Sequence, residues 1–302
     1  MTIQFHCPKC DALIAFPDKH RGKRARCLTC RQLFIIPDKD NQTPQIVEPE
    51  KTGPLPGFYR AVFIDSWKLL IKPQSVTPLF FVAAVVCFKF FAGHLDYSFD
   101  MGPYRFQAPV GQLVTIAAWG CLLWYYMEII HLTAFDTEDL PEVYAGGFFG
   151  FLWNIVRSIC TFFIALLIVL LPCVIALVIS NRIGAQWPVL LHVLAIAGLF
   201  AFPMAILILS VGRDITMLFR PGNILRPLIR AFCPYLVAVV LFVLACQLQL
   251  WLEVRGYGRL LHERGVVVAL HLLGNLGVQI IAIIAMRSIG LFYRHHSSHF
   301  PW

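Results

Sequence analysis

Residues 158–181 read SICTFFIALLIVLLPCVIALVISN, a run of 24 residues without a charge between Arg157 and Arg182. A helix needs about 20 residues to cross the apolar core of a bilayer. Four further charge-free stretches have at least 22 residues each: 106–127, 183–212, 231–252 and 265–286. A sixth apolar stretch, residues 73–92, is interrupted only by Lys89 near its end, where a lysine can extend toward the headgroups. The sequence therefore predicts six transmembrane helices.

The composition of the 302-residue chain agrees with a membrane protein. Apolar residues make up 58% of the chain and charged residues 14%, and the mean hydropathy is +0.70. The surface of a soluble protein needs roughly a quarter of its residues charged. These values exclude a disordered chain, a coiled coil and an ordinary soluble enzyme. We predict an all-α multipass bundle over residues 73–302.

Four cysteines near the N-terminus have the spacing of a metal site. Cys7 and Cys10 form one CxxC pair, Cys27 and Cys30 form another, and sixteen residues separate the pairs. Two CxxC knuckles can present four thiolates to one tetrahedral Zn²⁺. The alternative is a redox pair of the thioredoxin kind, but such a site uses one CxxC at a helix start. We predict one structural zinc ion bound by all four cysteines.

Residues 5–37, FHCPKCDALIAFPDKHRGKRARCLTCRQLFIIP, resemble the short prokaryotic zinc-ribbon family. In that family a CxxC pair, an apolar strand ending near a proline and a Gly-Lys dipeptide precede a second CxxC pair and strand. Gly22 and Lys23 occupy the Gly-Lys place. The resemblance covers about a tenth of the chain and implies a small domain of β knuckles that binds zinc and has no catalytic role. We place this domain at residues 1–40.

Two further segments are predicted ahead of the bundle. Residues 41–57 hold several prolines and glycines with few apolar residues, which is typical of a flexible linker. Residues 58–72 have helical periodicity with opposed apolar and charged arcs. This segment is predicted to be an amphipathic helix in the headgroup plane; the alternative is a helix that docks on the bundle.

The distribution of positive charge predicts the orientation. With the N-terminus inside, ten loop arginines and lysines lie on the inner side and six on the outer side. Residues 1–10 lack the apolar core of a secretory signal, and four reduced thiols are favoured in a reducing cytoplasm. We expect both termini to be cytoplasmic and the protein to be integral to the bacterial cytoplasmic membrane. The membrane region also resembles uncharacterised bacterial multi-helix membrane proteins. The resemblance rests on an acidic Leu-Pro-Glu loop, here residues 138–142, and on a Pro-Tyr pair, here Pro234 and Tyr235. These motifs are too short to indicate an activity.

Polar residues within the last predicted span are the candidates for a functional face. His271, Asn275 and Gln279 are spaced four residues apart and share one side of a helix, with Gly274 and Gly277 nearby. Amides and small residues in a span pack helices together, whereas a polar lining would serve a substrate or proton path. We favour packing, because the sequence offers no opposing acidic residue inside a span.

The acidic residues after the second span offer no metal site. Glu128 and His131 form a single Glu-x-x-His motif, and a di-metal bundle site needs two. Asp136, Glu138, Asp139 and Glu142 are expected to form a solvated loop, although a lipid-modifying enzyme would draw on the same residues. The chain contains no nucleophile elbow, phosphate-binding loop, zinc-protease or dinucleotide motif.

The sequence thus predicts a non-enzymatic integral membrane protein. It presents a cytoplasmic zinc ribbon to a protein partner or to the membrane surface. The alternative is a transporter or channel with the ribbon as an accessory sensor. A basic patch spans residues 19–31, but no aromatic residues alternate with its charges as a base-stacking surface requires. We therefore do not expect nucleic acid to be the partner.

Overall fold

The computed structural model describes residues 2–7, 13–17, 24–26, 33–37, 55–93, 95, 97–101, 104–108, 110–135, 139–143, 147–183, 187–212, 215–256 and 265–300. The chain divides into two compact units, Met1–Gly53 and Pro54–Trp302.

The first unit contains two antiparallel hairpins. Strand β1 (Thr2–His6) pairs with β2 (Leu13–Pro17), and β3 (Arg24–Arg26) pairs with β4 (Leu33–Ile35). Phe5, Cys7 and Ile36 are buried. In each hairpin, one strand lies before a CxxC pair in the sequence and the other strand lies after it.

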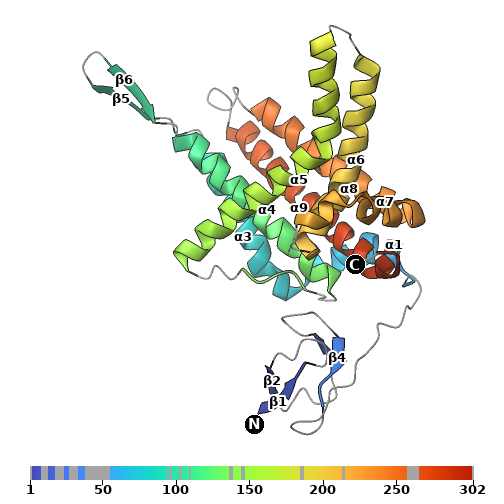
Figure 1. Ribbon diagram of the computed structural model, residues 1–302. Helices are drawn as coiled ribbons and strands as arrows, with labels where there is room; N and C mark the ends of the chain where they lie inside the picture. Colours follow the sequence, from blue (N-terminus) through green and yellow to red (C-terminus); the bar gives the residue numbers. More distant parts are fainter. Residues whose placement is uncertain are drawn as a thin grey trace. The chain divides into compact units, whose positions relative to one another are not determined.

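The second unit is built from long helices (Figure 1). They are α3 (Val76–Ala92), α4 (Val110–Ala134), α5 (Phe148–Ile183), α6 (Pro188–Gly212), α8 (Phe232–Gly256) and α9 (Gly265–His296). Among the described residues, six helical segments are long and apolar enough to cross a membrane, and each overlaps one of these helices over most of its length. The prediction of six spans is confirmed, and the chain is a multipass integral membrane protein.

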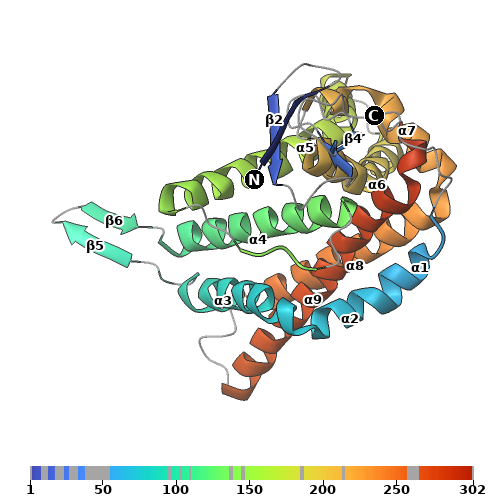
Figure 2. The same ribbon diagram turned by 90° about the horizontal axis from the view of Figure 1, so that it is seen from below.

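Helix α9 lies at the centre of this bundle. It packs against α8, α4 and α3, and the two views agree on this arrangement (Figures 1 and 2). The core includes Tyr125 of α4, Tyr235 of α8 and Phe292 of α9. The second half of α6 is also buried, from Phe202 to its end.

Helices α5 and α6 form a hairpin that leaves the bundle. Their far ends rise side by side away from the other helices (Figure 1). Large apolar side chains are exposed along both helices, among them Leu167 of α5 and Ile196 of α6. Helix α5 has 36 residues, which corresponds to about 54 Å at 1.5 Å per residue. Apolar side chains exposed along so long a helix are expected to contact the acyl chains of a bilayer.

Three helices continue past charges that we expected to mark their ends. Helix α4 extends six residues beyond Glu128, α5 contains Arg157, and α9 contains Arg287, whose exposed fraction is 8%. The prediction of Arg157 and Arg287 as loop residues was wrong. Counting the uncharged residues between two charges locates a span but underestimates the length of its helix. A charged side chain near a helix end can be accommodated by neighbouring residues or by the headgroup layer, so the helix continues past it.

A continuous helical segment precedes α3. It comprises α1 (Phe58–Arg60), a π-helical turn (Ala61–Asp65) and α2 (Ser66–Ile71). Phe58, Val62 and Leu69 are buried, and the segment contacts α9, beside which it lies in Figure 2. Tyr59, Phe63 and Trp67 are about half exposed. One face of the segment therefore packs on the bundle, and a second face with aromatic side chains stays exposed.

Two short elements were not anticipated in full. Strands β5 (Tyr97–Met101) and β6 (Tyr104–Ala108) form a hairpin between α3 and α4, a segment for which the sequence analysis predicted no strand. After a 3-10 turn at Ile215–Phe219, α7 (Pro221–Arg230) begins with Pro221 in its first turn. The buried Asn223 side chain near the start of α7 donates from Nδ2 to the Met217 carbonyl oxygen at 2.9 Å.

Close approach of α9 to α4 depends on Gly290. A Cβ atom at this position would lie 2.8 Å from the Ile130 carbonyl oxygen and 2.7 Å from the Thr133 Cβ. Neither atom can move without its backbone. We expect Gly290→Ala to lower the free energy of unfolding by about 1–3 kcal/mol, the usual cost of overpacking. Denaturation of the purified protein in detergent measures this change.

Gly277 supplies the matched control, because it lies on the same helix and has no atom within 4 Å of an added Cβ. Gly277→Ala should leave stability unchanged or raise it by about 0.5–1 kcal/mol through helix propensity. Equal losses at both positions would show that the contact at Gly290 does not set the spacing of α9 and α4. Of the two glycines that the sequence analysis noted on this helix, Gly274 lies close to Leu252 of α8, whose Cδ2 would be 3.2 Å from an added Cβ, whereas Gly277 has no such neighbour and the tightest approach occurs at Gly290.

Candidate functional site

The predicted zinc ligands fall between paired strands. Cys7 directly follows β1 and is buried, while Cys10, Cys27 and Cys30 lie outside the described residues. In the sequence, one CxxC pair falls between β1 and β2 and the other between β3 and β4. The described residues contain no group of three metal-ligating side chains, but that set includes only one of the four cysteines. The zinc site stays a prediction.

The other cysteines are free thiols in the membrane helices. All six lie in apolar stretches of the sequence. Cys121 is buried, but Cys160 and Cys233 are exposed on the protein surface. They lie on faces of α5 and α8 that lipid can contact, so an apolar stretch of sequence did not imply burial within the bundle.

A chain of polar side chains crosses the interior of the bundle. Tyr126 of α4 donates its hydroxyl hydrogen to Gln279 Oε1 of α9. Gln279 Nε2 donates in turn to Gln249 Oε1 of α8 at 3.0 Å. Gln249 and Gln279 are both buried. We call these three residues, together with the ion pair described next, the interior polar chain.

The chain ends in an ion pair between α3 and α8. Gln249 Nε2 donates to Glu253 Oε1 at 3.2 Å, and the same oxygen accepts a hydrogen bond from Lys89 Nζ. The Lys89 ammonium also lies 4.3 Å from the centroid of the Trp119 ring of α4, a favourable cation–π arrangement. Lys89 and Glu253 are each three residues from the end of their helix, so the pair lies near one end of the bundle.

Helical spacing explains how these residues meet. Gln249 and Glu253 are four residues apart and share a face of α8. Gln279 is fourteen residues into α9, or about 21 Å from its start at 1.5 Å per residue. The interior polar chain therefore extends from the end of α3 and α8 toward the middle of α9, and joins four helices.

The three residues that we singled out on α9 have different environments. Gln279 is part of the interior polar chain. Asn275 is buried but donates to the His271 carbonyl of its own helix at 2.9 Å. The His271 ring lies 6.0 Å from that of Phe90 on α3. The predicted polar face is therefore not continuous, and only Gln279 connects helices through hydrogen bonds.

The sequence reasoning missed the partners of Gln279. Glu253 was used only as the boundary of a span, so the statement that no acidic residue within a span opposes α9 was wrong: the Phe232–Val254 span contains Glu253. Two signals pointed to this site. One was Lys89 inside an otherwise apolar stretch, and the other was a glutamine four residues before Glu253.

The acidic loop after α4 has a structural contact. Lys72 Nζ lies 3.0 Å from Asp139 Oδ1, and both side chains are exposed. The His131 ring packs against Phe135 at 5.0 Å. Asp136 and Glu138 lie outside the described residues. Asp139 thus pairs with the lysine before α3 rather than with an arginine of a later loop.

Each amide of the interior polar chain both donates and accepts within the protein. Hydrogen bonds of this kind hold transmembrane helices together. The six spans and this interior define the class, a multipass integral membrane protein with a hydrogen-bonded core. No known protein family, curated protein or solved structure matches the chain.

Proposed function

We propose that this protein is a non-enzymatic membrane anchor that displays a zinc-binding N-terminal unit as an interaction module. The observation that carries the proposal is the place of the four cysteines. Each CxxC pair falls between the two strands of an antiparallel hairpin, β1–β2 or β3–β4. Two such hairpins can bring their knuckles to one tetrahedral metal ion.

The donor set fits zinc. Four thiolates are soft ligands that satisfy the tetrahedral preference of Zn²⁺ without water or substrate in the coordination sphere. Such a closed site contributes to folding and leaves no open position for catalysis. The zinc ion would hold the two hairpins together, and the surface that they present would meet a protein partner or the membrane surface.

The metal content of the full chain tests this proposal. Protein purified in detergent should contain about one zinc ion per chain. Cys10→Ser and Cys30→Ser should each lower that content strongly, because a thiolate is lost from a closed site. Cys160→Ser, a free thiol of α5, is the control and should leave it unchanged. Full occupancy after either of the first two substitutions would contradict the four-cysteine site.

We also propose that the N-terminal unit and the C-terminus lie in the cytoplasm, in a bacterial cytoplasmic membrane. The proposal is supported by the excess of arginines and lysines assigned to the inner side. Topology reporters fused after Asp40, within residues 94–105 and after Trp302 measure the orientation. A cytoplasmic signal from the middle fusion would overturn it.

The alternative function is that of a transporter or channel, and polar residues inside the bundle are the observation that favours it. The side chains of the interior polar chain nevertheless form hydrogen bonds with one another, and this supports a role in helix packing. Uptake by proteoliposomes separates the two functions. Transport that is abolished by Gln279→Leu but retained after deletion of residues 1–57 would replace our proposal.

A further inference from the structure

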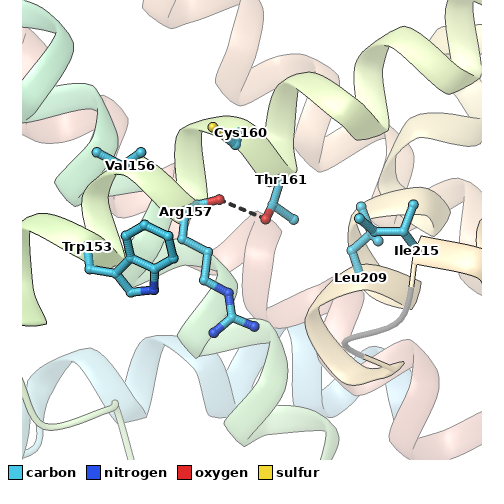
Figure 3. A pocket seen from close by; sticks show the side chains of 7 residues that line it. All are labelled: Trp153, Val156, Arg157, Cys160, Thr161, Leu209 and Ile215. Atoms are coloured by element: carbon cyan, nitrogen blue, oxygen red, sulfur yellow. Dashed lines mark hydrogen bonds between the residues drawn. The ribbon is translucent and has the colours of Figure 1, made fainter.

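A pocket opens between the first part of α5 and the end of α6. It has a volume of about 280 Å³ and is lined on one side by Trp153, Arg157 and Cys160. Figure 3 shows Trp153 and Arg157 extending side by side from α5, with Leu209 and Ile215 across from them. The pocket is mainly apolar, with one cationic side chain at its edge.

The ends of the charge-free run of α5 place this pocket relative to the bilayer. The 24 residues between Arg157 and Arg182 span about 36 Å of helix, slightly more than the apolar core of roughly 30 Å. Trp153 and Trp187 flank this run and are 65% and 40% exposed. Tryptophan and arginine are typical of the two interfaces. Arg157 and the mouth of the pocket therefore lie at the level of the lipid headgroups.

The charge around the pocket favours an anion. Arg157 is exposed and has no ion pair among the residues that the structure describes. Between Glu142 and Glu253 the sequence contains a single acidic residue, Asp214. A guanidinium recognises phosphate oxygens through paired hydrogen bonds.

We propose that this pocket binds an anionic phospholipid. The phosphate lies on Arg157, the Trp153 ring packs beside the headgroup, and an acyl chain follows Cys160 and Leu209 into the apolar core. Basic pockets between helices at a membrane interface are suited to such headgroups. This inference depends on α5, α6 and the 3-10 turn that follows α6, and it stands apart from the zinc-binding unit.

Lipid titration of the full chain tests the proposal. The protein is delipidated in detergent and titrated with phosphatidylglycerol or phosphatidylcholine, and bound lipid is counted by native mass spectrometry. We expect one phosphatidylglycerol to be retained in preference to phosphatidylcholine. Arg157→Gln should weaken that binding roughly tenfold, the value of a hydrogen bond to a charged group, and Arg157→Lys should weaken it less. Arg182→Gln, the same charge change at the far end of α5, should leave it unchanged.

Alkylation of Cys160 gives an independent readout, since this exposed thiol lines the pocket. Saturating phosphatidylglycerol should slow its reaction with a maleimide, while the exposed Cys233 of α8 should react at the same rate as before. Equal affinity of wild type and Arg157→Gln, or equal protection by phosphatidylcholine, would overturn the proposal. Protection by inorganic phosphate alone would show that the pocket binds the free anion rather than a lipid.

Discussion

A peptide of residues 1–42 is expected to be unfolded without metal and to fold on binding one zinc ion. Among the side chains described in this unit, Phe5 and Ile36 supply the large buried apolar groups. Ordering a residue costs about 1.5 kcal/mol, which so small a core cannot offset. Structural zinc contributes about 10–16 kcal/mol in comparable peptides at neutral pH. Circular dichroism during a zinc titration measures the transition.

Cobalt substitution identifies the ligands of the same peptide. Four thiolates around Co²⁺ give intense charge-transfer bands and the ligand-field absorption of a tetrahedral ion. Cys10→Ser or Cys30→Ser should shift these bands and weaken binding, whereas His6→Ala and His20→Ala should not. A peptide that folds without metal, or that gives no tetrahedral spectrum, would reopen the redox interpretation of the two CxxC pairs.

The second large effect is expected at the ion pair of the interior polar chain. The side chains of Lys89 and Glu253 are 16% and 27% exposed, and both lie in helices surrounded by lipid and apolar protein. Replacing either residue by leucine leaves the other charge without its partner. Loss of one member of a fully buried pair costs about 3–5 kcal/mol, whereas an exposed pair contributes about 0–1 kcal/mol. Because this pair is partly buried, we expect Lys89→Leu and Glu253→Leu each to lower stability in detergent by about 1–3 kcal/mol.

The double variant distinguishes the pair from two independent contributions. With both residues replaced by leucine no charge remains to be compensated, and apolar replacement of a buried pair is often close to neutral. Stability should recover most of the loss. Lys72→Leu is the control, since Lys72 pairs with Asp139 on an exposed surface, where such pairs contribute about 0–1 kcal/mol. Additive losses in the double variant would show that Lys89 and Glu253 do not act as a pair.

The positions of the spans could be predicted from the sequence because the requirement is local. A stretch such as residues 158–181 carries all the information needed to place a helix in a membrane. The ends of the helices were harder to predict than the positions of the spans. Helix α5 begins before Arg157, and α9 continues past Arg287. A helix can continue past a charged residue when neighbouring groups or the headgroup layer accommodate the charge. Those neighbours come from other parts of the chain, so one stretch of sequence does not reveal them.

The interior polar chain could not be predicted, because its members are distant in sequence. Tyr126 and Gln279 are 153 residues apart, and Lys89 and Glu253 are 164 apart. Periodicity identifies which residues share a face of one helix, but it does not show which helix that face meets. The sequence therefore identified Gln279 as a residue of interest and gave no means of choosing its partners.

The central position of α9 determines when the bundle can be completed. Synthesis inserts α3 to α6 and α8 into the membrane first, yet each of α8, α4 and α3 packs against α9 in the finished bundle. Leu55, just ahead of α1, also donates its backbone N–H to the His295 carbonyl at 2.9 Å. Helices α3 to α6 contact one another before α9 arrives, but the bundle cannot close until translation has passed α9. During that interval the Tyr126 hydroxyl, whose partner Gln279 lies on α9, and the open face of α4 are the surfaces at which membrane chaperones and proteases would act.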